Sequence, residues 1–381
     1  MNYLIIIIPF ITAVLLGRVL LPYILLVSYK KRLFDPIDNR KQHKSIIPRL
    51  GGGAFVPVQV SVFILTFVAV FKFQLLELHM QSWAILPSIM LTICGLILLF
   101  IVGLGDDLVG IGYKWKFVAQ IVAASFFPIS GLWINDLYGL FGIGTLSEWV
   151  GMPLTIFLVV FFINAINLMD GIDGLCSGIV IIGTSLIGTY FIFVDALLYA
   201  SFAFITIGIL ISFFYYNVFG TSRRGRRIFM GDTGSMTLGY SLAFLSISFA
   251  MNNSYIKPVV DNALLIAFSV LIVPSFDVLR VMFLRWRSSN PVFKPDRNHL
   301  HHKLLGAGMS PKGALLVILS LSISFIIINI LVSALINTTL VVLLDIALWN
   351  IFHYLLNVMM HRQGNQGVEE TELVLKKHIV Q

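Results

Sequence analysis

The chain has 381 residues, of which 58% are hydrophobic and only 12% are charged, with a formal net charge of +8. A soluble domain usually carries about 25% charged residues, so this composition excludes an ordinary soluble protein. The positive charge comes without a recognition motif or a folded basic domain, which argues against nucleic acid as a partner.

Apolar runs recur along the whole chain, and a membrane-spanning helix needs roughly 20 mainly apolar residues. A membrane β-barrel would instead show short segments of alternating hydrophobicity. The sequence therefore predicts an all-α polytopic membrane protein with about eleven spans. We place them near residues 3–27, 51–71, 84–104, 115–133, 150–168, 175–194, 196–216, 233–251, 262–283, 313–336 and 338–357. The fifth and sixth leave open a merged or re-entrant segment.

Lysine and arginine residues gather in loops that eleven spans place on one side of the membrane. Of the 26 in the chain, 23 lie in residues 28–50, 105–116, 217–232 and 280–312 and in the tail after residue 358. Positively charged loops face the cytoplasm, so we expect the N-terminus outside and the C-terminus in the cytoplasm. We assign residues 1–357 to one integral-membrane domain and residues 358–381 to a cytoplasmic tail.

Half of the 18 acidic residues are aspartates at or near the predicted cytoplasmic ends of spans. Asp106 and Asp107, in "GLGDDLVGIG", end the third span. Adjacent carboxylates repel each other, so the pKa of one should rise unless cations lie nearby. A solvated helix end explains the pair simply, and a proton acceptor or a metal ligand is the alternative.

The stretch "NAINLMDGIDGL", residues 164–175, follows an apolar run directly. Asn164, Asn167 and Asp170 are spaced three apart, so on a helix they drift only gradually around one side. Gly171 and Gly174 let the chain turn and approach a ligand closely. Asn and Asp oxygens are hard ligands that suit Mg²⁺, so we favour a metal site over a simple helix-capping turn.

In "RRGRRIFMGDTGSM", Asp232 lies directly before the "TGS" that opens the eighth span. Thr233 or Ser235 could cap that helix, which is the structural explanation. A helix N-terminus with small residues also favours phosphate oxygens, and Asp232 could hold a metal beside them. The arginines of this loop are most simply topology residues, with phosphate contact by one or two left open.

The stretch "PDRNHLHHKL" places His299, His301 and His302 in a basic loop with Arg297. Zinc is disfavoured, because no cysteine is near and Asp296 is the only acid close by. Contact with an anion or a proton-transfer role suits these histidines better than a purely structural role. The three glycines of "GGG", residues 51–53, also allow close backbone approach on the same face.

Hard oxygen ligands and basic residues on one face indicate phosphoryl chemistry with Mg²⁺, and the membrane setting suggests a lipid substrate. "GxxxxGK[ST]" does not occur, which argues against P-loop ATP hydrolysis. The motifs "GGG", "GDD", "NAINLMDGIDGL", "FMGDTGSM" and "HLHH", in this order, resemble the polyprenyl-phosphate N-acetylhexosamine-1-phosphate transferases. The resemblance runs from about residue 35 to 305 and fits eleven spans. The "HxHH" form is similar to the branch that transfers N-acetylglucosamine-1-phosphate to undecaprenyl phosphate.

The resemblance implies that a polyprenyl phosphate attacks the β-phosphorus of a UDP-N-acetylhexosamine and releases UMP. It assigns Asp106 and Asp107 to the neighbourhood of the lipid phosphate, with Asp106 as the base. Asn167 and Asp232 match Mg²⁺ positions with Asp170 close by, and Mn²⁺ could replace Mg²⁺. Whether a carboxylate attacks first, to give a covalent intermediate, stays open.

Further positions carry over to the donor substrate. Asp173 and Phe229 match positions near the uracil. Lys44 matches a basic residue near the nucleotide. His301 and His302 match the histidines that contact the diphosphate or sugar. The predicted site residues are Asp106, Asp107, Asp170, His301 and His302 for catalysis, Lys44, Asn164, Asp173, Phe229, His299 and Arg297 for the substrate, and Asn167, Asp232 and Asp170 for the metal.

The implied partners are undecaprenyl phosphate, a UDP-N-acetylhexosamine and the lipid bilayer of a bacterial inner membrane, and a homodimer is left open. The product would start a lipid-linked glycan of the O-antigen, capsule or teichoic-acid type. Two departures bear on this: Gly110 stands where a "DDxxD" pattern has its third acid, and "TSRRGRR" is unusually basic, which leaves a different sugar open.

Three alternatives remain. The branch that transfers phospho-N-acetylmuramoyl-pentapeptide more often shows three consecutive histidines. A cation-coupled transporter predicts acids near the membrane midplane and repeated halves, whereas these acids lie at one interface. A scaffold for other glycan enzymes would not need the clustered aspartates and histidines.

Overall fold

The computed structural model describes residues 3–33, 47–75, 85–221, 225–253, 260, 262–289 and 298–379, with side chains as far as residue 360. Its helices are α1 Leu4–Lys31, α2 Phe55–Lys72, α3 Leu86–Val109, α4 Tyr113–Ile129, α5 Glu148–Leu168, α6 Leu175–Phe193, α7 Leu197–Val218, α8 Gly231–Ala250, α9 Ala263–Ser269, α10 Ile272–Arg287, α11 Leu300–Gly306, α12 Pro311–Val332 and α13 Thr338–Ile379. A 3₁₀ turn, η1 Gly51–Ala54, precedes α2, and β1 Asp136–Leu140 pairs antiparallel with β2 Ile143–Thr145.

The bundle is built around α8, which packs against α3, α5, α6 and α9. Apart from Asp232, every residue of α8 is buried. Its many Gly, Ser and Thr residues let neighbouring backbones approach closely, as small residues do between membrane helices. At Gly239, for example, an added Cβ would lie only 2.8 Å from the Cα of Ile163 on α5.

Within the described residues, eight helices are long and apolar enough to cross a membrane, or nine if the bent pair α9–α10 counts as one span. The predicted count of eleven is therefore not confirmed, although a helix occupies each predicted position. The low hydropathy of α8 has a physical reason, because this helix faces protein on all sides and needs no lipid-compatible surface.

The predicted ninth span, residues 262–283, is wrong as a continuous helix. The chain breaks after Ser269 and bends by 73° between α9 and α10. The fifth and sixth predicted spans are separate helices, joined by residues 169–174. The predicted boundary between residues 357 and 358 lies inside α13, which continues through it without a break.

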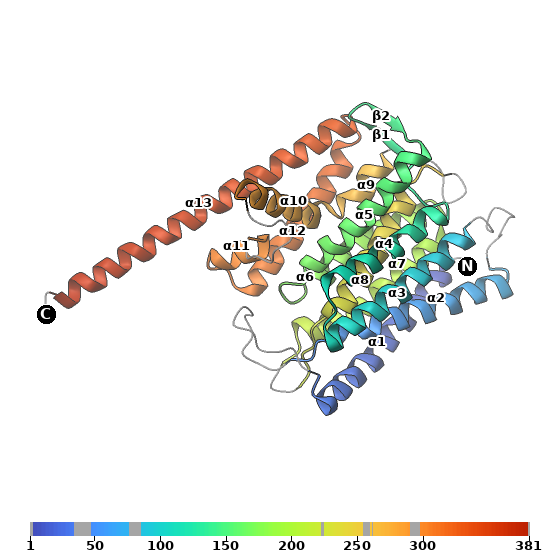
Figure 1. Ribbon diagram of the computed structural model, residues 1–381, viewed down its shortest axis with the longest axis horizontal. Coiled ribbons are helices and arrows are strands. Elements are labelled where there is room, and N and C mark those ends of the chain that lie inside the picture. Colours follow the sequence, from blue (N-terminus) through green and yellow to red (C-terminus); the bar gives the residue numbers. More distant parts are fainter. Residues whose placement is uncertain are drawn as a thin grey trace.

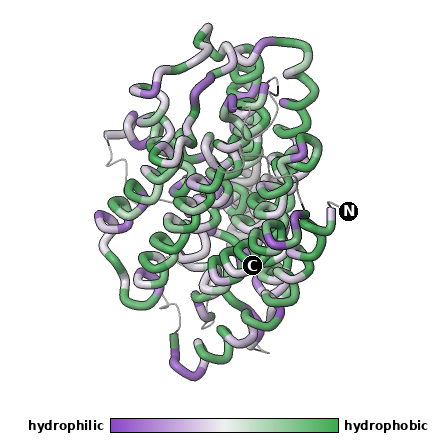
Figure 2. Tube along the Cα trace, turned by 90° about the vertical axis from the view of Figure 1, so that its right-hand side faces the viewer, coloured by the Kyte–Doolittle hydropathy of each residue, from purple (hydrophilic) through white to green (hydrophobic). Residues whose placement is uncertain are grey.

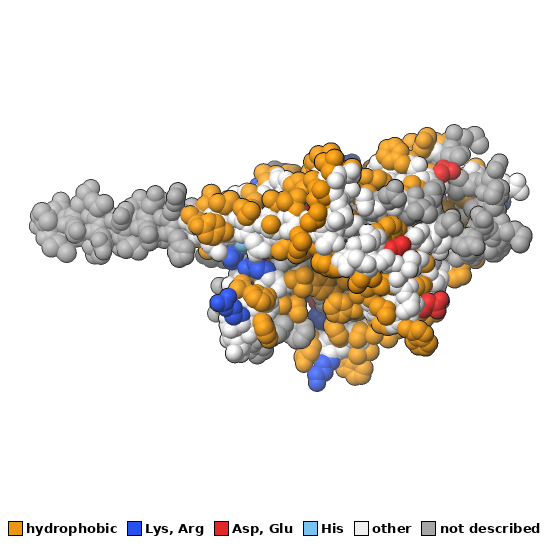
Figure 3. Space-filling model, turned by 90° about the horizontal axis from the view of Figure 1, so that it is seen from above, with side chains coloured by type: hydrophobic (Ala, Val, Ile, Leu, Met, Phe, Trp, Pro, Cys, Tyr) orange, Lys and Arg blue, Asp and Glu red, His pale blue; other side chains and the backbone are white. Residues whose placement is uncertain are grey.

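The two ends of the bundle differ in character. The β1–β2 hairpin and the start of α1 lie at one end, and the turns between α3 and α4 and between α5 and α6 lie at the other (Figure 1). Apolar residues dominate the helices, and hydrophilic residues concentrate toward their ends (Figure 2). Most Lys and Arg side chains visible in Figure 3 lie in the half of the molecule that holds α10 and α11.

Candidate active site

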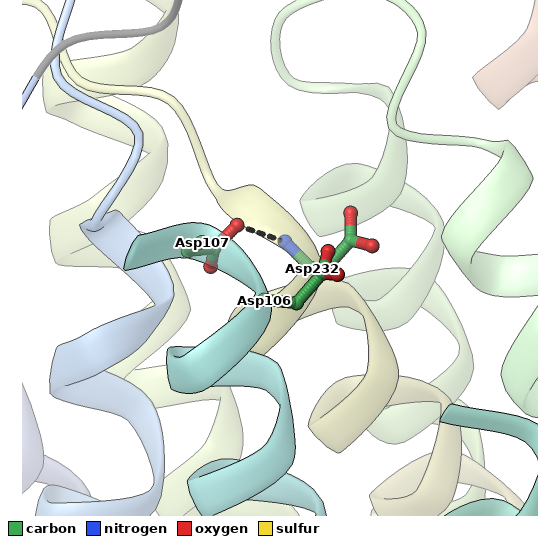
Figure 4. Close-up of side chains that lie close together, drawn as sticks. All are labelled: Asp106, Asp107 and Asp232. Atoms are coloured by element: carbon green, nitrogen blue, oxygen red, sulfur yellow. Dashed lines mark hydrogen bonds between the residues drawn. The ribbon is translucent and has the colours of Figure 1, made fainter. Parts of the chain in front are cut away.

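Three carboxylates meet at the end of the bundle away from the hairpin. Asp106 and Asp107 come from the last turn of α3, and Asp232 comes from the first turn of α8. One oxygen from each lies within 4.8 Å of the others, and among the described residues this is the one such group of potential metal ligands. Asp106 and Asp232 point to the same side, whereas Asp107 turns toward the α8 backbone (Figure 4).

Glycines allow α3 and the segment before α8 to come this close. An added Cβ at Gly103 would lie 2.6 Å from the Cα of Thr233. Gly231 has a φ of +76°, and a Cβ there would lie 2.4 Å from an oxygen of Asp107. The "GGG" run works in the same way, because a Cβ at Gly52 would lie 2.2 Å from the backbone nitrogen of Gly234. The close approaches at Gly103 and Gly52 are made to protein backbone, and the distance given for Gly231 is to the Asp107 side chain.

Asp107 caps α8 from a different helix. Its Oδ1 accepts the backbone N–H of Asp232 at 2.9 Å, and its Oδ2 accepts the backbone N–H and the hydroxyl of Thr233 at 3.0 and 2.6 Å. The expected capping by Thr233 or Ser235 is therefore corrected, because both hydroxyls donate: Thr233 to Asp107, and Ser235 to the carbonyl of Gly231 at 3.1 Å. The carboxylate also neutralises the positive end of the helix dipole.

Two cations compensate the three carboxylates. Lys116 Nζ lies 3.1 Å from Asp106 and 2.8 Å from Asp232, so it bridges α3 and α8. Arg49 Nη2 lies 3.0 Å from the other oxygen of Asp232, and Arg49 Nε lies 3.5 Å from Asp107. The repulsion expected between the adjacent carboxylates is relieved, because the two side chains point apart and each meets donors of its own.

The "NAINLMDGIDGL" stretch spans the end of α5, a turn and the start of α6. Asn167 donates its amide hydrogen to Ser235 on α8 at 2.7 Å. Asn164, predicted to bind substrate, donates to Gln120 on α4 at 2.6 Å and to the carbonyl of Val160 at 2.8 Å. The stretch therefore fixes the end of α5 against two neighbouring helices.

Asp170 lies in the turn that follows α5, close enough to Asp232, Asp107 and Arg49 to interact with their charges. Desolvation by the surrounding protein, and then the negative charge of Asp232, raise the pKa of Asp170 well above its usual range, against the opposing charge of Arg49. Because solvent reaches this side chain, water screens part of that effect. A carboxyl whose pKa is raised holds its proton more readily than an ordinary aspartate does.

Asp173 and Phe229, both predicted to lie near the uracil, each contact the same arginine, Arg227. Asp173 forms an ion pair with Arg227, whose guanidinium carbon lies 5.8 Å from the centre of the Phe229 ring. Asn217 on α7 donates to Asp173 at 3.3 Å and accepts the N–H of Gly174 at 2.6 Å. An aromatic face beside a carboxylate and an arginine can hold a planar, polar base.

The histidines approach the same turn from α11. His299 precedes this helix, and its Nδ1 lies 2.8 Å from Asp277 on α10. His301 is buried, and its Nε2 lies 2.2 Å from the place that a Cβ on Gly171 would occupy. Among the described residues, no group of three or more metal-binding side chains includes a histidine. Lys44 and Arg297, also predicted to bind substrate, lie outside the described residues.

Several residues of the site belong to no motif that the sequence shows. Lys116 contacts two of the three clustered carboxylates. In the sequence it could be recognised only as a lysine that follows the acidic pair within ten residues, on the same predicted side of the membrane. Arg227 looks like a topology residue in the sequence, and Asn217 lies inside an apolar run. Asp277 stands out only as one more interfacial acid, because two of its three partners, His299 and Leu300, lie 22 and 23 residues further along the chain.

Comparison with known proteins identifies the family of the chain. The model of a family described as "Glycosyl transferase family 4" matches residues 88–250, which include all three clustered carboxylates. A probable undecaprenyl-phosphate N-acetylglucosaminyl 1-phosphate transferase of Bacillus subtilis (strain 168) is 30% identical over 319 residues, covering 82% of this chain and 81% of that protein.

Two further relatives are named undecaprenyl-phosphate alpha-N-acetylglucosaminyl 1-phosphate transferase. The proteins of Yersinia pestis and Escherichia coli (strain K12) are 29% and 27% identical over 300 residues, and each match covers 77% of this chain and 74% of the relative. The chain thus belongs to glycosyl transferase family 4, and it is a phosphoglycosyltransferase of the multi-pass membrane type.

Proposed function

We propose that this enzyme transfers N-acetylglucosamine-1-phosphate from UDP-N-acetylglucosamine to undecaprenyl phosphate, with release of UMP. The reaction would take place at the cytoplasmic face of a bacterial inner membrane and start a lipid-linked glycan. One observation carries the proposal: three carboxylates and two cations meet at one end of a bundle of apolar helices. The names of the relatives indicate the substrates.

The donor set suits Mg²⁺. Asp106 and Asp232 offer hard carboxylate oxygens on the same side of the cluster, and Lys116 already lies between them as a positive charge. The side-chain N–H of Asn167 donates to Ser235, which leaves the amide oxygen of Asn167 to serve as a ligand. When bound, Mg²⁺ would supply positive charge to the diphosphate oxygens.

The protein's own groups would do the positioning. Asp106 is proposed to accept a proton from the lipid phosphate or to orient it, because the chain beside Asp106 presents apolar side chains that suit the bilayer. Val109 and Trp115 are 84% and 72% exposed. Lys116 and Arg49 would neutralise charge on the transferring phosphoryl group, which is the main catalytic task in such reactions.

The donor substrate would lie across the other elements. The Asp173–Arg227–Phe229 cluster is proposed to hold the uracil, with the aromatic ring as a stacking surface. His301 and His302 on α11 would contact the diphosphate or the sugar, since His301 lies against the turn that contains Asp170. This arrangement would point the donor's phosphorus atoms toward Asp106 and Asp232.

The deciding experiment measures UMP release by purified protein with Mg²⁺ and undecaprenyl phosphate across a panel of UDP-sugars. Lipid-dependent UMP from UDP-N-acetylglucosamine, abolished by EDTA and restored by Mg²⁺ or Mn²⁺, is the expected result. If UMP is released only from UDP-N-acetylmuramoyl-pentapeptide, the enzyme belongs to the peptidoglycan branch instead. Activity that survives EDTA would defeat the metal assignment, and no lipid-dependent UMP from any donor would overturn the proposal.

Two variants test the metal site in this assay, one in the carboxylate cluster and one control far from it. Asp232→Asn should nearly abolish turnover, because it removes a proposed metal ligand and one partner of Lys116. Asp136→Asn changes an aspartate in the hairpin at the other end of the bundle and should leave turnover unchanged.

A further inference from the structure

Asp277 on α10 is a carboxylate outside the metal-binding cluster, and it is fully buried. It accepts from the Nδ1 of His299 at 2.8 Å, from the backbone N–H of Leu300 at 2.9 Å and from Arg280 Nη2 at 3.1 Å. A buried carboxylate is costly unless hydrogen-bonded, and these three donors compensate it. Two of the three come from the segment that begins α11.

Arg280 also binds the segment that begins α11. Its Nη2 donates to the carbonyl of Asn298 as well as to Asp277. Asp277 and Arg280, which lie one helical turn apart on α10, therefore hold the backbone of residues 298–300 at two points, the carbonyl of Asn298 and the N–H of Leu300. The pairing also sets the orientation of the His299 ring, because its Nδ1 is engaged by Asp277.

From His299 the contacts lead directly to the site. The rings of His299 and His301 are nearly parallel, at 3° and with centres 6.0 Å apart. His301 in turn lies against Gly171 so closely that a Cβ there would clash with its Nε2. Gly171 follows Asp170 in the turn after α5, where Asp170 interacts with the charges of the carboxylate cluster. A shift of α11 would therefore move His301 relative to that turn.

We propose that Asp277 is a positioning residue for the transfer reaction, holding His299–His302 against residues 169–174 so that His301 and His302 meet the donor's diphosphate. The inference rests on the proposed function. Asp277 itself does not touch the substrate, and it acts through His299 and Leu300. A displacement of about 1 Å in a positioning group can reduce turnover by about 100-fold, which makes the role measurable.

The test begins with Asp277→Asn, which keeps the size of the side chain but removes its charge and one acceptor oxygen. The expected kcat for UMP release falls on the order of 10–100-fold. The inhibition constant of UMP as a product should stay within about twofold, because Asp173 in the proposed uracil site is held by Arg227 and by Asn217 on α7, and neither residue belongs to α10 or α11. Asp136→Asn, in the far hairpin, is the matched control and should retain full kcat. An unchanged kcat in Asp277→Asn would overturn the proposal.

A double-mutant cycle tests whether Asp277 acts through His299. If it does, Asp277→Asn combined with His299→Gln should be no more than about twofold worse in kcat than the poorer single variant. Effects that multiply would overturn the proposal, because two independent residues behave in that way.

Chemical modification gives a readout that needs no turnover. His299 and His301 are 6% and 3% exposed, so diethyl pyrocarbonate should modify them slowly in the wild-type protein. In Asp277→Asn both should react several-fold faster, while the equally buried His353 on α13 keeps its rate. Equal rates in both proteins, or a parallel rise at His353 from general loosening, would overturn the proposal. A wild-type enzyme that releases no UMP would defeat the proposed function, yet this measurement would still test the positioning contact.

Discussion

Asp106 and Asp107 are neighbours in the chain, yet their surroundings assign them different tasks. Asp107 has both oxygens occupied by donors from the first turn of α8. Asp106 accepts one backbone N–H, from Ile111 at 2.8 Å, and otherwise faces Lys116. We therefore expect Asp107 to stabilise the fold and Asp106 to serve the chemistry.

The two asparagine variants separate these tasks. Asp107→Asn should lower the free energy of unfolding by about 1–2 kcal/mol, because an amide replaces a charged cap and cannot accept all three hydrogen bonds. Asp106→Asn should change stability little but abolish turnover. Thermal unfolding in detergent, measured beside UMP release, decides between them. Equal losses of stability in both variants would contradict the division of roles.

His301 makes stability depend on pH. Burial first, and then the nearby His302, lower its pKa from about 6.5 to about 3, against the opposing charge of Asp277. Below pH 6.5, His301 therefore binds a proton in the unfolded chain but stays neutral in the folded protein. Stability from this group is complete above pH 6.5 and is lost as the pH falls toward 3.

The measurable consequence is a comparison of two proteins at two pH values. Between pH 7 and pH 5, the wild-type protein should lose about 2 kcal/mol more free energy of unfolding than His301→Gln. Denaturant unfolding of both proteins at both pH values measures this difference. An identical loss in both proteins would show that His301 is not held neutral by the fold.

At the scale of single residues, the motifs predict which side chains lie near one another, but not which of them form hydrogen bonds and ion pairs with each other. The sequence brings Asp106, Asp107 and Asp232 to one face, since all three end or begin helices on the same side. It cannot reveal that Asp107 caps α8, because the bonded amides lie 125 and 126 residues away. Lys116 likewise shows its role only when α4 lies beside α8.

The contact between α3 and α8 aligns Asp106 and Asp107 on α3 with Asp232 on α8. Gly103 permits it, since an added Cβ would lie 2.6 Å from backbone of α8. Gly103→Ala should push the helices apart by a few tenths of an ångström or more. We expect turnover to fall at least tenfold, because the carboxylates of α3 and α8 would no longer align.

The matched control is Gly112→Ala in the turn after α3, where an added Cβ meets open space. Its φ of −59° is compatible with alanine, so this variant should keep its activity. UMP release by both variants, at equal amounts of folded protein, measures the difference. Similar activity in the two would mean that the helix contact does not control the alignment.

Helix positions are well predicted because apolar runs are long, but three elements depend on tertiary packing. The bend between α9 and α10 lies inside one apolar run, so no change of composition marks it. The hairpin depends on glycines with positive φ at Gly139 and Gly142, in a segment too short to show alternation. The helix α8 looks weak as a span because its surroundings are protein.

On the scale of the whole molecule, function and topology depend on the same asymmetry. The carboxylates at the end of α3 and the start of α8, the histidines of α11 and most of the cations visible in Figure 3 lie away from the hairpin, which occupies the other end of the bundle (Figure 1). A UDP-sugar is a cytoplasmic, membrane-impermeant anion, so the site end must face the cytoplasm if the proposed reaction is right. The positive-inside rule independently predicts this orientation.

Cysteine accessibility in intact cells tests that orientation. In a background with Cys94→Ser and Cys176→Ser, we expect Phe141→Cys in the hairpin to react with a membrane-impermeant maleimide, because Phe141 is 63% exposed at the end predicted to lie outside. Lys312→Cys, at the exposed start of α12 beside α11, should react only after the membrane is permeabilised. The reverse pattern would place the carboxylate cluster outside the cell. UDP-sugars could not then reach it, and the transfer reaction would fail together with the topology.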